Sequence, residues 1–187
     1  MSSVKSNPKP LFVKPKAKGP VARTLVFNPF CSVTMSDTTV IGSKSDSSLE
    51  AASAISTYLS NGPEISNWIF VYNECFFEMR KTLNIEPYNF LNDYEQIKEK
   101  SKDIYLLVEN EEIIGSIACY GNEIDDLIVN KKFQHKGYGK QLLLWGMQCI
   151  RKKNTEPIVL HVAEWNKNAL LLYKKNGFEI TNIEKIR

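Results

Sequence analysis

The sequence contains no apolar run long enough to cross a bilayer. Its longest runs are WIFVY and LLLW, whereas a membrane-spanning helix needs about 20 predominantly apolar residues. The N-terminus also lacks the continuous apolar stretch of a secretory signal, because Lys14 directly follows the short run LFV. We therefore expect no association with a membrane.

The chain has only four cysteines, and no two of them have the C-x-x-C spacing of a redox or metal-binding motif. Scattered cysteines of this kind are typical of reduced, buried thiols in a cytoplasmic protein, which is the location that we expect. Paired disulfides or a metal site are the alternatives, although no ligand set predicts a metal. The four are Cys31, Cys75, Cys119 and Cys149.

Two common phosphate-binding motifs are also absent. A dinucleotide fingerprint would need a third Gly or Ala three residues after Gly139, where Leu142 stands. A P-loop would need Gly-Lys-Ser/Thr after four intervening residues, and the sequence has no such pattern. Both classes of nucleotide-binding protein are therefore excluded.

Acidic residues are missing from the first 36 positions, which carry six basic residues and hence a charge of +6. Since the whole chain has a net charge of +3, the remainder carries −3. Near its start, Pro8, Pro10, Pro15 and Pro20 oppose regular structure. We expect residues 1–36 to be a basic extension, partly disordered or supplying an extra strand, and 37–187 to form a single domain. No aromatic interleaving or recognised module supports nucleic-acid binding.

What the sequence does contain is a strand, a Gly-rich turn and a helix in direct succession from Glu123 onward. Residues 123–129 become apolar toward their end, and Gly137 and Gly139 precede the amphipathic segment 140–153. Such a turn directs several unpaired backbone N–H groups at one point, where the helix dipole adds partial positive charge. An anion-binding site is therefore expected here.

Periodicity and turn signals predict the other elements. We expect three consecutive hairpin-linked strands before the turn and a β-α-β step after it, whose second strand runs parallel to 123–129. The expected strands are 23–27, 38–42, 103–109, 112–120, 123–129, 158–163 and 178–183, and the expected helices are 47–60, 64–83, 92–100, 140–153 and 167–176.

The Gly-rich turn resembles motif A of the GNAT N-acetyltransferase superfamily, Gln/Arg-x-x-Gly-x-Gly/Ala. A second motif of that family follows downstream: Asn, Ala three residues on, Tyr seven on, then Gly-Phe entering the next strand. Both matches come in family order, and the resemblance covers roughly residues 100–185. The matching residues are Gln134, Gly137 and Gly139 in the first motif and Asn166, Ala169, Tyr173, Gly177 and Phe178 in the second.

The resemblance implies an α/β (α+β) fold, a mixed and mainly antiparallel sheet with helices on both faces. Its central parallel strand pair would be splayed around acetyl-CoA, the co-substrate. In this family a sixth strand usually pairs with a seventh, and the sequence ends at Arg187 before a seventh is expected. We therefore expect the run RTLVF (23–27), or its copy from a second subunit of a homodimer, to fill that position.

The resemblance also implies which residues bind the donor. The turn amides would hold the pyrophosphate, the basic side chains would add contacts to phosphates, and the end of the strand would pair with the pantetheine arm. Asn166 would orient the cofactor or simply cap its helix. The implied residues are Leu127, Ile128, Val129, Gln134, His135, Lys136, Gly137, Tyr138, Gly139, Lys140, Asn166 and Tyr173.

Acetyl transfer to a primary amine needs a proton for the leaving thiolate, a donor to the oxyanion and a base for the amine. The family match gives Tyr173 as the general acid, and the backbone amide of Ile128 or its neighbour as the oxyanion donor. Glu123 resembles the base of the histone acetyltransferase branch, with Asp125, His161 or an ordered water as alternatives. Strand alternation places Asp126 on the opposite face. A non-catalytic acyl-CoA-binding or regulatory module is the alternative function.

Overall fold

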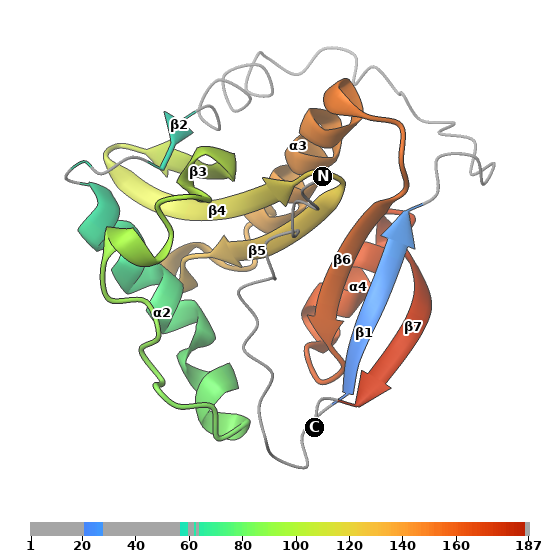
Figure 1. Cartoon of the computed structure of the whole chain (residues 1–187), viewed down its shortest axis with the longest axis horizontal. Helices are drawn as coiled ribbons and strands as arrows, with labels where there is room; N and C mark the ends of the chain where they lie inside the picture. The colour runs from blue at the N-terminus through green and yellow to red at the C-terminus, as the bar shows by residue number, and fades with distance from the viewer. Residues whose placement is uncertain (1–20, 28–56, 60–61, 63, 186–187) are drawn as a thin grey trace, which may run out of the picture.

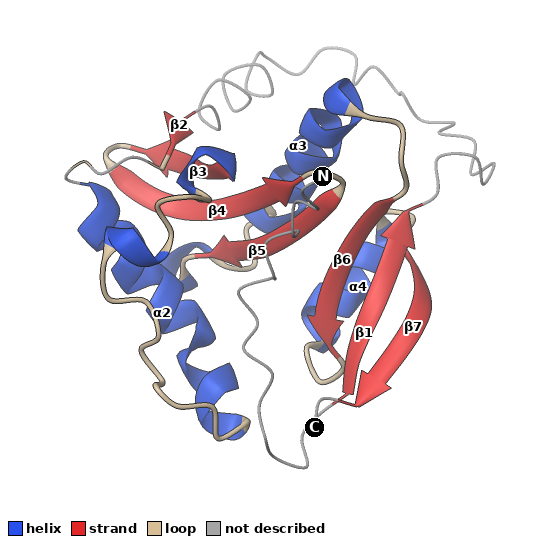
Figure 2. Ribbon diagram, in the orientation of Figure 1, coloured by secondary structure: helices blue, strands red, loops and turns tan. Residues whose placement is uncertain are grey.

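The computed structural model describes residues 21–27, 57–59, 62 and 64–185 of the chain. They form one mixed sheet of seven strands in the order β2-β3-β4-β5-β6-β1-β7, with helices on both faces (Figure 1, Figure 2). The expected fold class is confirmed. The elements are β1 (Val21–Phe27), β2 (Thr57–Tyr58), α2 (Glu64–Thr82), β3 (Ile104–Glu109), β4 (Glu112–Tyr120), β5 (Glu123–Val129), α3 (Tyr138–Lys153), β6 (Ile158–Ala163), α4 (Lys167–Lys175) and β7 (Glu179–Lys185).

The antiparallel meander β3-β4-β5 is built as the sequence predicts. Its two links are tight because their residues adopt positive φ, which reverses the chain within two residues. Asn110 and Glu111 have φ of 49° and 65°, and Gly121 has φ of 63°. The bounds of β4 and β5 agree with the prediction, and the meander brings β5 to the middle of the sheet.

The only parallel pair in the described sheet joins β5 to β6, and this pair is short. Its register contains Glu123 opposite Val159 and Ile124 opposite Leu160, and no further residues. Beyond Ile124 the two strands diverge, as Figure 1 shows. The expected splayed pair is thus present, and β5 has no strand partner on its β6 side from Asp125 onward.

Strand β1 lies between β6 and β7 and is antiparallel to both. Leu25 is fully buried there, opposite Leu160 of β6. The prediction that RTLVF enters the sheet is confirmed, and the strand comes from the same chain, so no second subunit is needed to supply it. The division into a 1–36 extension and a 37–187 domain stays a prediction.

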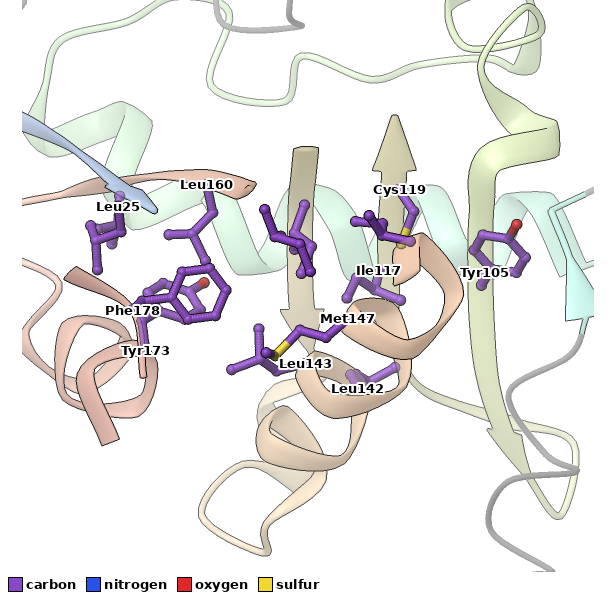
Figure 3. Close-up of a cluster of buried hydrophobic side chains, with 14 of the residues drawn as sticks. Leu25, Tyr105, Ile117, Cys119, Leu142, Leu143, Met147, Leu160, Tyr173 and Phe178 are labelled. Carbon is purple, nitrogen blue, oxygen red and sulfur yellow. The ribbon is translucent and has the colours of Figure 1, made fainter. Parts of the chain in front are cut away.

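The sheet has a separate apolar core on each face. On one face α3 and α4 pack over Leu25, Ile117, Leu160 and Phe178 (Figure 3). On the other face α2 packs through Trp68, whose indole Nε1 donates a hydrogen bond of 2.9 Å to the buried Ser116 hydroxyl. This bond fixes α2 against β4, because an unpaired indole N–H at full burial would be costly.

Two predicted helices are wrong where the structure describes them. The helix expected at 47–60 is contradicted at its end, where Thr57 and Tyr58 pair with β3 and Leu59 is not helical; residues 47–56 and 60, and the strand predicted at 38–42, lie outside the described residues. The helix expected at 92–100 is replaced by 3-10 turns at Tyr94–Gln96 and Ser101–Asp103. A capping box between Asp93 and Gln96 closes a single turn there, and the segment buries Ile97 instead of continuing as an amphipathic helix.

No helix within the described residues is long and apolar enough to span a membrane. Among the same residues, Cys75, Cys119 and Cys149 are free thiols. The described part of the chain likewise has no group of three His, Cys, Asp or Glu side chains arranged to hold a metal ion.

Candidate functional site

The turn before α3 presents a row of open backbone amides. Gly137 is the N-cap residue of α3 with φ of 92°, and His135 has φ of 63°. The first hydrogen bonds of the helix run from the amides of Lys140 and Gln141 to the Gly137 carbonyl. Within the described residues, the amides of 135–139 have no acceptor. Solvent-accessible amides at a helix N-terminus suit a phosphate group.

Gln134 ties this turn to the end of β5, because its side-chain Nε2 donates a 3.0 Å hydrogen bond to the Val129 carbonyl. The Tyr138 hydroxyl donates to a carboxylate oxygen of Glu109 at 3.1 Å. That hydrogen bond, followed by burial, raises the pKa of Tyr138. Lys136 lies over the Phe133 ring at 5.2 Å, and its charge remains on an exposed side chain. Gln134 and Tyr138 therefore hold the turn in place, while its amides stay open.

A bulge in β5 determines what faces the gap between β5 and β6. Ser116 lies opposite Ile128 whereas Ala118 lies opposite Asp125, so β5 contains one residue more than β4 over this span. Asp126 takes up the extra residue with φ of 44°, a conformation that Asp and Asn tolerate better than most residues.

The prediction that Asp126 points away from Asp125 is wrong, because it assumed unbroken strand alternation. The Tyr72 hydroxyl of α2 lies 3.5 Å from Asp126 Oδ1. Asp125 and Asp126 line the same pocket. The bulge thus turns two successive carboxylates toward one space.

This pocket lies where β5 and β6 part. Its walls come from α2, from β5, from the end of β6 and the loop after it, and from α4. Tyr173, Asn166 and Leu127, all expected from the sequence, meet here, together with His161 and Asp125 from the list of alternative bases. The other residues are Phe76, Met79, Ile124, Asp126, Val162, Ala163 and Trp165.

Tyr173 is 7% exposed and packs against Phe178, with ring centroids 6.0 Å apart (Figure 3). Its hydroxyl forms no hydrogen bond with any described residue, although the side chain lines the pocket. Burial, and secondly the charge of Asp125, raise the pKa of Tyr173 to about 12. The prediction from sequence assumed a phenol with the usual pKa, so Tyr173 is a weaker acid than expected.

Glu123 does not line the pocket but reaches it through His161. Nε2 of His161 lies 3.5 Å from Glu123 Oε1, and Nδ1 lies 3.2 Å from the hydroxyl of Thr24 on β1. Burial, and then the charge of Asp125, raise the pKa of Glu123. Thr24, His161 and Glu123 therefore form a chain of polar contacts across β1, β6 and β5.

The pKa values of both aspartates are raised as well. Burial raises the pKa of Asp125, and burial followed by the charge of Asp125 raises the pKa of Asp126 well above its usual range. The Asp126 amide donates to Asp125 Oδ1 at 2.9 Å. Neither carboxylate forms an ion pair with a described residue.

The remaining predicted residues have structural roles as well. Asn166 caps α4, since its side-chain oxygen accepts a 3.1 Å hydrogen bond from the Ala169 amide. Ile128 is buried under α2, whereas Leu127 and Val129 pack toward α3. Their backbone edge on the β6 side is unpaired, so an extended ligand could pair with it.

Sequence reasoning missed the contribution of α2, which supplies Phe76 and Met79 to the pocket and Tyr72 to Asp126. Nothing in the sequence signals these contacts, because α2 is far from β5 along the chain. The bulge was missed too, and its one signal is that Asp126 belongs to a residue type that accepts positive φ.

Comparison with known proteins agrees with this geometry. The family model described as "Acetyltransferase (GNAT) family" matches residues 67–178. The chain belongs to this family. The match includes most of α2, β5, the turn, α3 and the pocket residues of β6 and α4, so the turn before α3 and the pocket both lie inside it.

Solved structures support the same fold. PH1933 from Pyrococcus horikoshii OT3 is 25% identical with a TM-score of 0.57, over 68% of this chain and 88% of that one. A GCN5-related N-acetyltransferase from Sphaerobacter thermophilus is 15% identical with a TM-score of 0.58, over 91% of this chain and 53% of its own. The present chain thus spans about half the length of that GNAT protein. GNAT proteins are in general acetyl-CoA-dependent acyltransferases that act on amines, although some members are non-catalytic.

Proposed function

We propose that this chain is an N-acetyltransferase that moves the acetyl group of acetyl-CoA to a primary amine. The observation that carries the proposal is the Tyr173 side chain, which is buried and lines the pocket where β5 and β6 part, with no hydrogen-bond partner for its hydroxyl among the described residues. A binding module has no need of a proton donor at that position. An acyltransferase needs one beside the leaving sulfur.

The residues present fit the donor. The open amides of 135–139 suit its pyrophosphate, with Lys136 and Lys140 exposed beside them. The free edge of β5 from Asp125 to Val129 suits its amide-containing arm. Once bound, acetyl-CoA would supply an activated acetyl thioester.

Tyr173 would hold a proton at its hydroxyl oxygen next to the leaving group. With a pKa of about 12 the phenol is fully protonated at neutral pH. A thiolate that forms in the same buried space has its own pKa raised by the same desolvation. The two groups therefore stay closer in acidity than the shift of Tyr173 alone suggests.

The amine proton would leave through His161 and Glu123. His161 lines the pocket and contacts Glu123, while Thr24 holds its other ring nitrogen. The imidazole is also half exposed, so the proton can pass on to solvent. Asp125 and an ordered water remain alternative acceptors of this proton.

The test is thiol release from acetyl-CoA by the purified chain against a panel of diamines, aminoglycosides, amino acids and lysine peptides, with calorimetric titration of acetyl-CoA alongside. Turnover of one acceptor class is expected. Tight binding of acetyl-CoA without turnover of any acceptor would instead favour the non-catalytic module. Absence of binding would contradict the assignment of the turn.

A further inference from the structure

The pocket beside Tyr173 has an unbalanced charge. Two adjacent carboxylates, Asp125 and Asp126, line it, whereas none of its described lining residues is a lysine or arginine. Buried carboxylates without a counter-charge are costly, so their retention calls for a reason.

The internal partners of these carboxylates are weak. Among the described residues, Asp126 has one long side-chain contact, 3.5 Å from the Tyr72 hydroxyl, and Asp125 accepts only the amide of Asp126 at 2.9 Å. Arg80 and Lys100 lower the pKa of Asp126 through space, but neither forms an ion pair with it among the described residues. Both carboxylates therefore keep oxygen lone pairs available to a ligand.

A second, independent feature marks the same space as a ligand site. Tyr173 enters it from α4 with its side chain more than nine-tenths buried and its hydroxyl unpartnered within the described residues. The hydroxyl of so buried a side chain is normally paired, and a molecule bound in the pocket would supply the partner.

Apart from His161 and Asn166, the rest of the lining is apolar. Phe76 and Met79 face the carboxylates from α2, and Leu127, Val162 and Trp165 complete the walls. A methylene chain fits these apolar walls.

We propose that this pocket takes an aliphatic diamine as the acetyl acceptor, with one ammonium group held by the Asp125–Asp126 pair and the other nitrogen beside Tyr173. This inference rests on the proposed acetyl transfer. In that reaction the free nitrogen forms the C–N bond while the thioester C–S bond breaks. The nitrogen loses one proton to the base, the sulfur gains one from Tyr173, and the products are a monoacetylated diamine and a free thiol.

The experiment compares 1,4-diaminobutane with n-butylamine, which has the same carbon chain and one charge fewer, using the full chain and saturating acetyl-CoA. We expect kcat/KM for the diamine to exceed that for butylamine by about tenfold or more, the effect of one charge-assisted contact. Asp126→Asn should lower kcat/KM for the diamine by about tenfold, mainly through KM, and change that for butylamine little. Asn retains the positive φ that Asp126 adopts, so the bulge should persist.

Glu179→Gln is the matched control, since it removes one exposed carboxylate on β7 away from the pocket. The midpoint of thermal unfolding, measured with 1,4-diaminobutane and without acetyl-CoA, detects binding without turnover. The diamine should raise it in the wild type and in Glu179→Gln, and less in Asp126→Asn.

Equal kcat/KM for diamine and butylamine would overturn the diamine inference and leave the transferase intact. Preference for a lysine peptide over every diamine would overturn it as well. If no acceptor is turned over while acetyl-CoA binds, the proposed function fails. In that case the thermal midpoint measured with 1,4-diaminobutane tests whether the diamine binds, and the absence of any shift would overturn the inference.

Discussion

The proposed donor side and acceptor side of the site present different chemical groups to a ligand. On the donor side, at the turn before α3, the groups offered to a ligand are backbone amides held by Gly137 and Gln134. On the acceptor side, between α2 and the β5 bulge, they are the side chains of Asp125, Asp126 and Tyr173. The backbone amides of the turn are positioned by a short local sequence pattern, whereas the three side chains are brought together by the packing of elements that are distant in sequence. A family can therefore keep its donor and change its acceptor by altering side chains alone.

The largest expected effect tests the proton donor on the acceptor side. Tyr173→Phe keeps the ring that packs on Phe178 and removes only the hydroxyl. We expect kcat to fall by about 100-fold, the lower range for loss of a general acid, while acetyl-CoA affinity holds. Steady-state kinetics with Tyr88→Phe, a half-buried tyrosine outside the pocket, as control would show this. An unchanged kcat would remove Tyr173 from the mechanism.

A smaller effect is expected on the donor side. Gly137→Ala places a Cβ in open space but at φ of 92°, so its cost is conformational only. We expect about 1 kcal/mol of lost stability and a weaker acetyl-CoA affinity, without a change in acceptor preference. Calorimetric titration and urea unfolding measure the two, and Gly137→Asn should be milder because Asn tolerates positive φ. A change in acceptor preference would contradict the independence of the donor side from the acceptor side.

The two sides of the site also differ in how much of them the sequence predicts. The shape of the turn before α3 was predicted because Gln134, Gly137 and Gly139 lie within one short segment whose geometry depends on neighbours in sequence, whereas its binding of the donor stays a prediction. The strand pairing of 23–27 followed from an unfilled sheet position. Asp126 was assigned to the wrong face because a bulge depends on how β4 and β5 pair, and Phe76 and Met79 were missed because packing of α2 leaves no local pattern.

The buried aspartate should also make stability depend on pH. Burial, followed by the charge of Asp125, raises the folded-state pKa of Asp126, whereas Lys100, the hydrogen bond from Tyr72 and Arg80 lower it. The other titratable groups around the two aspartates are Tyr120 on β4, Glu123 on β5, His161 on β6 and Tyr173 on α4. The folded state therefore binds the proton more tightly than the unfolded chain. This contribution is fully present below the unfolded pKa of about 4 and is lost as the pH rises through the folded pKa.

Asp126→Asn should consequently match the wild type in unfolding free energy near pH 4 and exceed it at neutral pH. The gain is expected to be of the order of 1 kcal/mol, typical for relieving a poorly paired buried polar group. Urea unfolding across this pH range measures it, with Glu179→Gln as the exposed control. A variant that is less stable than the wild type at neutral pH would show that Asp126 is already well compensated.

The smallest effect concerns β1, the strand that contributes Thr24. Thr24→Val keeps the branched shape and removes the hydroxyl that lies 3.2 Å from His161 Nδ1. We expect kcat/KM to fall by about threefold, the loss of one exposed hydrogen bond, with a displaced acidic limb of the pH profile. Thr24→Ser should restore both. A pH profile identical to the wild type would mean that β1 supports the sheet without positioning His161.

Amide hydrogen exchange of the full chain, with and without acetyl-CoA, tests the central claim most directly. We expect slower exchange at 135–139 and along 125–129 on donor binding, since among the described residues the amides of 135–139 have no acceptor and 125–129 has no strand partner on its β6 side. Protection confined to other segments, with no change at 135–139, would contradict it, because the donor would then be held elsewhere than by the turn before α3.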